Sequence, residues 1–175
     1  ALDYYRMAWW INPLSAEVYN SLGAVLLQDP ARHGAEALEV LKRAAHFFPG
    51  NPQYWHNLGF LYALQKRWPE AVDAYSRSLA LAPDMKNSEA ALLAAAARST
   101  RPPPPIVGGI ARLRQLESRL SQGDYSQASL DLALRLAADF PEMSKTRFLA
   151  GSLLLYHRRI EQARSHLEWV VSRDP

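Results

Sequence analysis

The stretch from Asn51 to Pro83 constrains the fold more than any other part of the chain. Apolar residues recur at helical spacing in its first half and again in its second half. Pro69 lies between the halves and suits the first turn of a helix, where its missing N–H is not needed. Pro52 and Pro83 bound the stretch. The pattern therefore predicts a helix, a tight turn, a second helix and a stop.

Small and large residues alternate along this predicted helix pair, as expected for two helices that pack against each other. Gly59 and Ala71 are the small ones, and two antiparallel helices need small residues where their backbones come closest. Trp55, Tyr62 and Tyr75 are large enough to fill the space around that contact. We expect these five residues to belong to one packed interface.

The pattern repeats along the chain, which is the signature of a repeat architecture. Tyr19 takes the place of Trp55, 36 positions earlier, and Gly151 begins the same order near the C-terminus. We assign a partial repeat to 1–13, repeats to 14–50 and 51–83, and two more to about 106–141 and 142–175. The expected core residues are Tyr19, Leu22, Gly23, Trp55, Leu58, Gly59, Tyr62, Ala71, Tyr75, Pro83, Gly151 and Ala163.

This signature resembles the tetratricopeptide repeat family, most closely in residues 51–83. One departure is Lys66, because the family often has Gly before the turn. The resemblance implies an all-α fold, a right-handed superhelical solenoid of antiparallel helix pairs. It also implies a concave groove that binds a peptide or a partner helix.

The middle of the chain interrupts the repeats. Residues 86–98 predict an extra helix, but four prolines follow at 102–105, and they favour polyproline II over helix. We expect a Pro/Gly linker at 99–109, a rigid spacer between sub-domains at 1–98 and 110–175. Two alternatives stay open: residues 106–121 complete the interrupted repeat in one continuous superhelix, or the prolines are a ligand for an aromatic-lined module.

Composition and motifs argue against catalysis in this chain. It has no Cys, which excludes disulfides, thiol nucleophiles and Cys-bound metals. No two of its five His stand at i, i+3 or i, i+4, and no phosphate-binding loop is visible. We therefore expect a non-enzymatic chain with no metal and no cofactor. The missing initiator Met suggests a piece of a longer protein, and no apolar run approaches the ~20 residues of a membrane span.

Charge is unevenly distributed along the chain. Net charge is +3 overall, and residues 98–175 carry 12 Lys/Arg against 8 Asp/Glu. The excess of basic residues could favour an anionic partner, but a genome rich in Arg codons would also produce it. Few aromatic residues interleave the arginines, so nucleic acid is not an expected partner. The composition suggests a bacterial source and leaves cytoplasm and cell envelope open.

The resemblance also implies which residues face the groove, because the first helix of each repeat lines the concave side. No Lys stands at the positions where relatives clamp a peptide carboxylate, so the groove is expected to be small and apolar. The alternative is that Phe60, Leu64 and Phe148 pack against each other or a neighbouring helix. The predicted groove residues are Asn20, Ala24, His56, Phe60, Leu64, Phe148, Ser152 and Tyr156.

Two classes of function fit this architecture. The first is a protein-interaction scaffold whose groove captures a peptide or helix of a partner. The second is an assembly or regulatory segment of a larger bacterial envelope protein for secretion, pilus formation, polysaccharide export or glycosyl transfer. Apolar residues on both terminal helices, including Trp10 and Val171, predict end-to-end self-association unless flanking sequence covers them.

Overall fold

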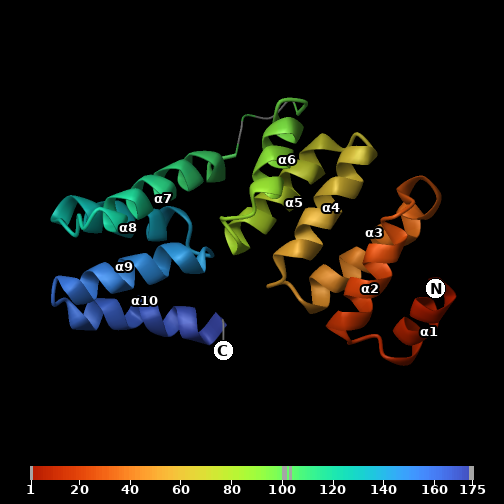
Figure 1. Ribbon diagram of the computed structural model, residues 1–175, viewed down its shortest axis with the longest axis horizontal. Helices are drawn as coiled ribbons and strands as arrows, with labels where there is room; N and C mark the ends of the chain where they lie inside the picture. The colour runs from red at the N-terminus through yellow and green to blue at the C-terminus, as the bar shows by residue number, and fades with distance from the viewer. Residues whose placement is uncertain (1, 100–101, 103, 174–175) are drawn as a thin grey trace. The chain divides into compact units, whose positions relative to one another are not determined.

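A computed structural model describes residues 2–99, 102 and 104–173. The described residues form ten helices, and consecutive helices pack in antiparallel pairs (Figure 1). This confirms the predicted all-α fold of helix pairs. The helices are α1 (Leu2–Ile11), α2 (Ala16–Leu26), α3 (Pro30–Phe47), α4 (Pro52–Leu64), α5 (Trp68–Leu81), α6 (Lys86–Ala96), α7 (Ile106–Ser121), α8 (Gln127–Asp139), α9 (Ser144–Tyr156) and α10 (Ile160–Arg173).

The helices belong to two compact units. The first unit covers 1–79 and 85–102 and holds α1 to α4, most of α5, and α6. The second covers 80–84 and 103–175 and holds α7 to α10. None of the helices in the described part of the chain has the length and apolarity that crossing a bilayer requires.

Local sequence explains where the helices of the first unit begin. Ser15 caps α2 by accepting a hydrogen bond from the Val18 amide, and Asp29 caps α3 in the same way through Arg32. Asn51 caps α4 through the Gln53 amide. Pro30 and Pro52 then occupy the first helical position of α3 and α4, where a missing N–H costs nothing.

Two turns between paired helices place a basic residue in the left-handed region. Lys66 between α4 and α5 has a φ of 58°, and Arg158 between α9 and α10 has a φ of 59°. The two residues are 92 positions apart, which fixes the register between the two repeats. Gly123 adopts a similar φ of 80° between α7 and α8. Lys66 therefore adopts the left-handed backbone conformation for which such a turn usually has Gly.

The predicted linker was too long at its C-terminal end. The sequence analysis extended it to Gly109, but α7 already begins at Ile106. Pro105 has helical dihedral angles and immediately precedes α7. Residues 100, 101 and 103 of the predicted linker lie outside the described residues. Gly109 lies inside α7 because its backbone packs against the ring of Phe140, and a side chain there would collide with that ring.

The core of the first unit differs from expectation along α4. Tyr54 is only 1 % exposed, and its hydroxyl donates a hydrogen bond of 2.9 Å to the backbone oxygen of Ala16. Trp55 and Tyr62, predicted as core, are half-buried instead. The remaining predicted core residues are all buried: Tyr19, Leu22, Gly23, Leu58, Gly59, Ala71 and Tyr75 in the first unit, and Pro83, Gly151 and Ala163 in the second.

Arginine side chains lie over most of the tryptophan rings. In the first unit the guanidinium groups of Arg43, Arg77 and Arg98 lie between 5.2 and 5.7 Å from the ring centres of Trp9, Trp55 and Trp68, respectively. Trp169, the tryptophan of the second unit, has Arg147 at 4.4 Å and Arg173 at 4.9 Å. Trp10 is different, because 82 % of it is exposed.

Candidate functional site

Four of the predicted groove residues form an exposed surface on the first helices of the first unit. Asn20 and Ala24 lie one turn apart on α2, and both are exposed. Phe60 and Leu64 lie one turn apart on α4, with exposed fractions of 38 % and 53 %. Exposed apolar side chains of this size at helical spacing are available for a ligand.

A pocket of about 380 Å³ lies next to Asn20 and Ala24. Its lining is unusually rich in amide side chains, because Asn51, Gln53 and Asn57 join Asn20 there. The sequence analysis missed these three residues. The signal was available for Asn57, which lies three positions before Phe60 and therefore on the same side of α4.

Hydrogen bonds fix the orientation of the amides in this pocket. The Gln53 amide nitrogen donates to Asn57 Oδ1 at 3.1 Å, and Asn51 Oδ1 accepts the Gln53 backbone N–H at 3.0 Å. The Asn57 amide nitrogen therefore points away from Gln53 and is available as a donor. Tyr19 also lines the pocket, and its buried hydroxyl has no hydrogen-bond partner among the described residues.

His56, also predicted to face the groove, is half-buried and hydrogen-bonded within the first unit. Its Nδ1 lies 2.8 Å from Ser88 Oγ, and Ser88 Oγ lies 3.0 Å from Ser78 Oγ. Ser78 also donates to the Met85 sulfur at 3.5 Å. Burial lowers the pKa of His56 and favours the neutral ring. His56 thus ties α4 to α6 through a chain of hydroxyl groups.

The Ser88–His56 pair resembles part of a nucleophilic site but cannot act as one in this structure. Ser88 is 0 % exposed, so its Oγ cannot reach an external substrate. The pair has a structural role, because it extends the buried Ser78–Ser88 hydrogen bond to α4. Within the described residues, no cluster of His, Cys, Asp and Glu could hold a metal ion.

The remaining predicted groove residues lie in the second unit, on α9. Phe148 and Tyr156 are more than half exposed, and Ser152 is half-buried. Ser152 and Tyr156 line a pocket of about 370 Å³ together with Tyr125, whose ring centre lies 4.9 Å from that of Tyr156. The eight predicted residues therefore fall into two sets, five in the first unit and three in the second.

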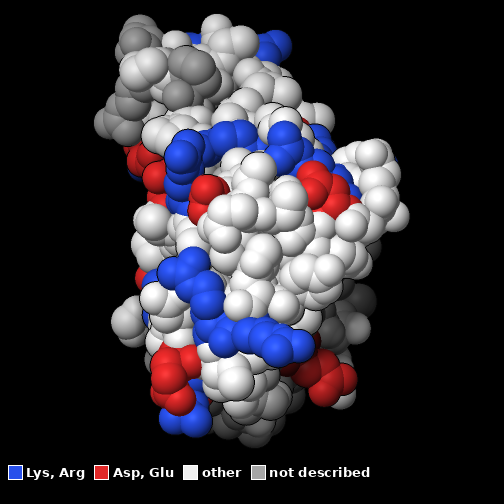
Figure 2. All heavy atoms as spheres, turned by 90° about the vertical axis from the view of Figure 1, so that its left-hand side faces the viewer, with Lys and Arg blue, Asp and Glu red and all other residues white. Residues whose placement is uncertain are grey.

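Several basic residues of the second unit are paired with acidic ones. Arg112 donates to Asp139 at 2.9 Å, and Arg173 donates to Glu142 at 3.0 Å. Lys145 lies 2.6 Å from Glu117. Figure 2 shows bands of Lys and Arg that are bordered by Asp and Glu and separated by uncharged surface. This is a mixed surface, unlike the continuous basic stripe that tracks a nucleic-acid backbone.

Comparison with known families explains the helix pair at the centre of the first unit. The family model of the tetratricopeptide repeat matches residues 52–85, which hold α4, α5 and the turn between them. Residues 52–85 form a tetratricopeptide repeat. The repeats form a protein-interaction domain on a scaffold fold that is typically non-catalytic.

Solved structures share the helix-pair fold over the whole of this chain. A crystal structure of MamA is 13 % identical, with a TM-score of 0.51 over 99 % of this chain and 86 % of that one. A crystal structure of YrrB, described as a TPR protein with an unusual peptide-binding site, is 15 % identical. Its TM-score is 0.52 over 100 % of this chain and 94 % of YrrB. At these identities the likeness concerns the fold. Comparison with curated proteins found no match.

Proposed function

We propose that this chain is a non-catalytic scaffold that binds a peptide segment of a partner protein on the first helices of its first unit. The observation that carries the proposal is the amide-lined pocket with the unpartnered Tyr19 hydroxyl beneath it. Side-chain amides donate and accept hydrogen bonds at once, as the main chain of an extended peptide requires. Asn20 and Asn57 would hold that main chain in place.

The neighbouring apolar side chains supply the second part of the proposed site. Phe60 is on the same side of α4 as Asn57, and Leu64 follows one turn later. A peptide whose main chain lies on Asn57 would place its next side chains over these two residues. We infer that the preferred ligand is an extended peptide with an apolar residue on one side of the bound amide group.

The test is a selection from a phage-displayed peptide library, followed by calorimetric titration of the selected peptides. Asn57→Ala should weaken binding by about tenfold, as expected when a polar ligand group loses its partner. The matched control is Gln28→Ala, which removes an exposed amide in the turn after α2, outside the pocket. Equal loss in both variants, or no loss in either, would place the ligand elsewhere.

We also propose self-association through α1, and a separate observation supports it. Tyr4, Met7, Trp10 and Ile11 are each more than 60 % exposed and lie on one short helix. A second copy of the chain would bury them. The same contact would serve the alternative function, an assembly segment of a larger bacterial envelope protein. Sedimentation of the wild type and of Trp10→Glu tests it: a wild type that stays monomeric at high concentration contradicts the proposal.

A further inference from the structure

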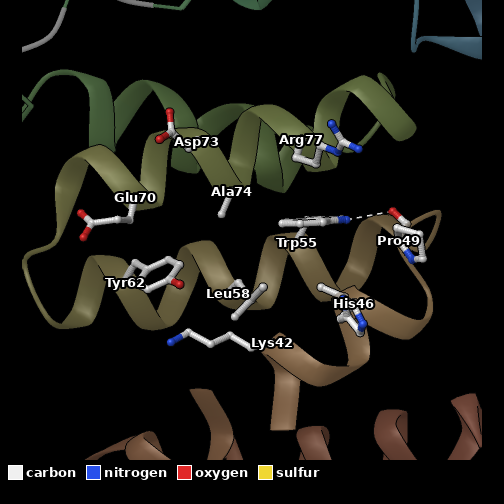
Figure 3. Close-up of a pocket in the computed structure, with 11 residues that line it drawn as sticks. Lys42, His46, Pro49, Trp55, Leu58, Tyr62, Glu70, Asp73, Ala74 and Arg77 are labelled. Atoms are coloured by element: carbon white, nitrogen blue, oxygen red, sulfur yellow. Dashed lines mark hydrogen bonds between the residues drawn. The ribbon is translucent and has the colours of Figure 1, made fainter. Parts of the chain in front are cut away.

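A larger pocket, of about 700 Å³, lies on the other side of α4 between α3 and α5 (Figure 3). Trp55, Leu58 and Tyr62 form its α4 wall. Asn57 and Phe60 each follow one of these residues by two positions, which is a rotation of about 200° around the helix axis. The pocket, here named the Trp55 pocket, is therefore separate from the proposed peptide surface.

The base of the Trp55 pocket is apolar and firmly held. Leu58 and Ala74 are buried, and in Figure 3 Leu58 lies on the α4 side of the pocket and Ala74 on the α5 side, next to Trp55. The Trp55 indole Nε1 donates a 2.9 Å hydrogen bond to the backbone oxygen of Pro49, which fixes the ring. The Arg77 guanidinium lies over this ring, 5.7 Å from its centre. The volume of the pocket suits a side chain or a small group.

Two acidic and two basic side chains line the Trp55 pocket, and the acidic ones already interact within the chain. The Glu70 carboxylate accepts two hydrogen bonds from Arg67, at 2.8 and 2.9 Å, and Asp73 is not free either. Lys42 and Arg77, in contrast, make no ion pair within the part of the chain that the structure describes. Figure 3 shows Lys42 on the α3 wall and Arg77 on the α5 wall. The positive charge on opposite walls therefore remains available to a ligand.

We propose that the Trp55 pocket is a second docking site, which binds an acidic amphipathic helix of a partner protein. One apolar side chain of that helix enters over Leu58 and Ala74, against the Trp55 ring. Side chains one turn before and after it lie about 5–6 Å away on each side, so Glu or Asp at those positions meets Lys42 and Arg77. The pocket carries two cations on opposite walls, which matches a helix with two carboxylates better than a single terminal carboxylate.

The experiment uses three synthetic peptides as probes. The first is an acetylated and amidated Ala-rich helix with a central Leu and Glu four residues before and after it. The second has Lys in place of both Glu. The third has no Glu and ends in Leu with a free carboxylate. Binding is followed by NMR through the Trp55 indole N–H, which is assigned by its loss in Trp55→Phe.

The acidic helix should shift the Trp55 indole signal and bind about tenfold more tightly than the basic helix, because attractive and repulsive rim charges each contribute modestly. Lys42→Glu should remove most of this preference while leaving Arg77 over the ring, and added salt should reduce it. Asn57→Ala should have no effect, which separates this site from the peptide surface. Equal binding of both helices, binding of the free-acid peptide alone, or indifference to Lys42→Glu would each overturn the proposal.

Discussion

The guanidinium group of Arg147 in α9 lies 4.4 Å from the centre of the Trp169 ring in α10. The equivalent positions 92 residues earlier carry Trp55 in α4 and Arg77 in α5, and there too the arginine lies over the ring, at 5.7 Å. The same stacked pair thus joins the first and second helices of both repeats, with the residue types exchanged between the helices.

Exchange of the pair in the second unit should therefore be tolerated. Arg147→Trp and Trp169→Arg should each destabilise the unit, and the double variant should recover a coupling of about 0.5–1 kcal/mol. Thermal unfolding of the four proteins in a double-mutant cycle measures that coupling. Arg173 also lies over Trp169 and is kept in all four. A double variant as unstable as the sum of the single changes contradicts the prediction.

Gly59 should not tolerate a side chain. A Cβ atom at this position would lie 2.7 Å from two ring carbons of Tyr75, so Gly59→Ala forces α4 and α5 apart. We expect a loss of about 1–3 kcal/mol in the free energy of unfolding. The control is Gly34→Ala within α3, where a Cβ meets nothing within 4 Å. That change should stabilise the protein by roughly 0.5–1 kcal/mol in urea denaturation.

Lys66 is held in a conformation that favours Gly, so Lys66→Gly should stabilise the first unit. Relief of the left-handed strain exceeds the extra entropy that Gly loses on folding, with a net gain of about 0.5–1 kcal/mol. Arg158→Gly should act in the same direction in the second unit. Lys66→Ala is the control, because it removes the charge and keeps the strain. A gain from Ala as large as that from Gly would assign the effect to charge.

Stability should fall as the solution is acidified through the range where histidine titrates. Burial lowers the pKa of His56, and burial together with the charge of Arg147 lowers the pKa of His166. The unfolded chain then binds protons more readily than the folded one once the pH drops below about 6.5. The free energy of unfolding is therefore highest above that pH and decreases below it.

Replacement of the two histidines tests this pH dependence. His56→Gln and His166→Gln should each flatten part of the slope between pH about 7.5 and about 5.5, and the double variant should flatten it most. Urea denaturation at several pH values provides the measurement. A double variant that keeps the wild-type slope would show that other groups dominate.

Residue spacing was enough to predict the helix pairs, since prolines, small residues and apolar periodicity each act within one or two turns. It was not enough to rank residues by burial. Tyr54 and Trp55 are neighbours with similar apolar character, and only the position of α2 and the end of α3 makes Tyr54 the buried one. Gly109 was placed in a linker because its partner, Phe140, is distant in sequence.

The candidate site was predicted least well where side chains from different helices meet. Exposure of Asn20, Phe60 and Leu64 followed from position on the first helices, which is a local property. The hydrogen bond between His56 and Ser88 joins residues 32 positions apart, so local residue spacing could not predict it. The Trp55 pocket could not be predicted for the same reason, because its charged residues come from α3 and α5, which are separated in the sequence by α4.

The arginine-covered tryptophans have a practical consequence for spectroscopy. Trp9, Trp10, Trp55 and Trp68 belong to the first unit, and Trp169 belongs to the second. A chain with Trp169→Phe would emit light from the first unit alone, and a chain that keeps only Trp169 would emit from the second. Trp10, exposed and red-shifted, would be quenched first by iodide. The intrinsic tryptophan fluorescence of these two variants would therefore show whether the two units unfold together or one after the other.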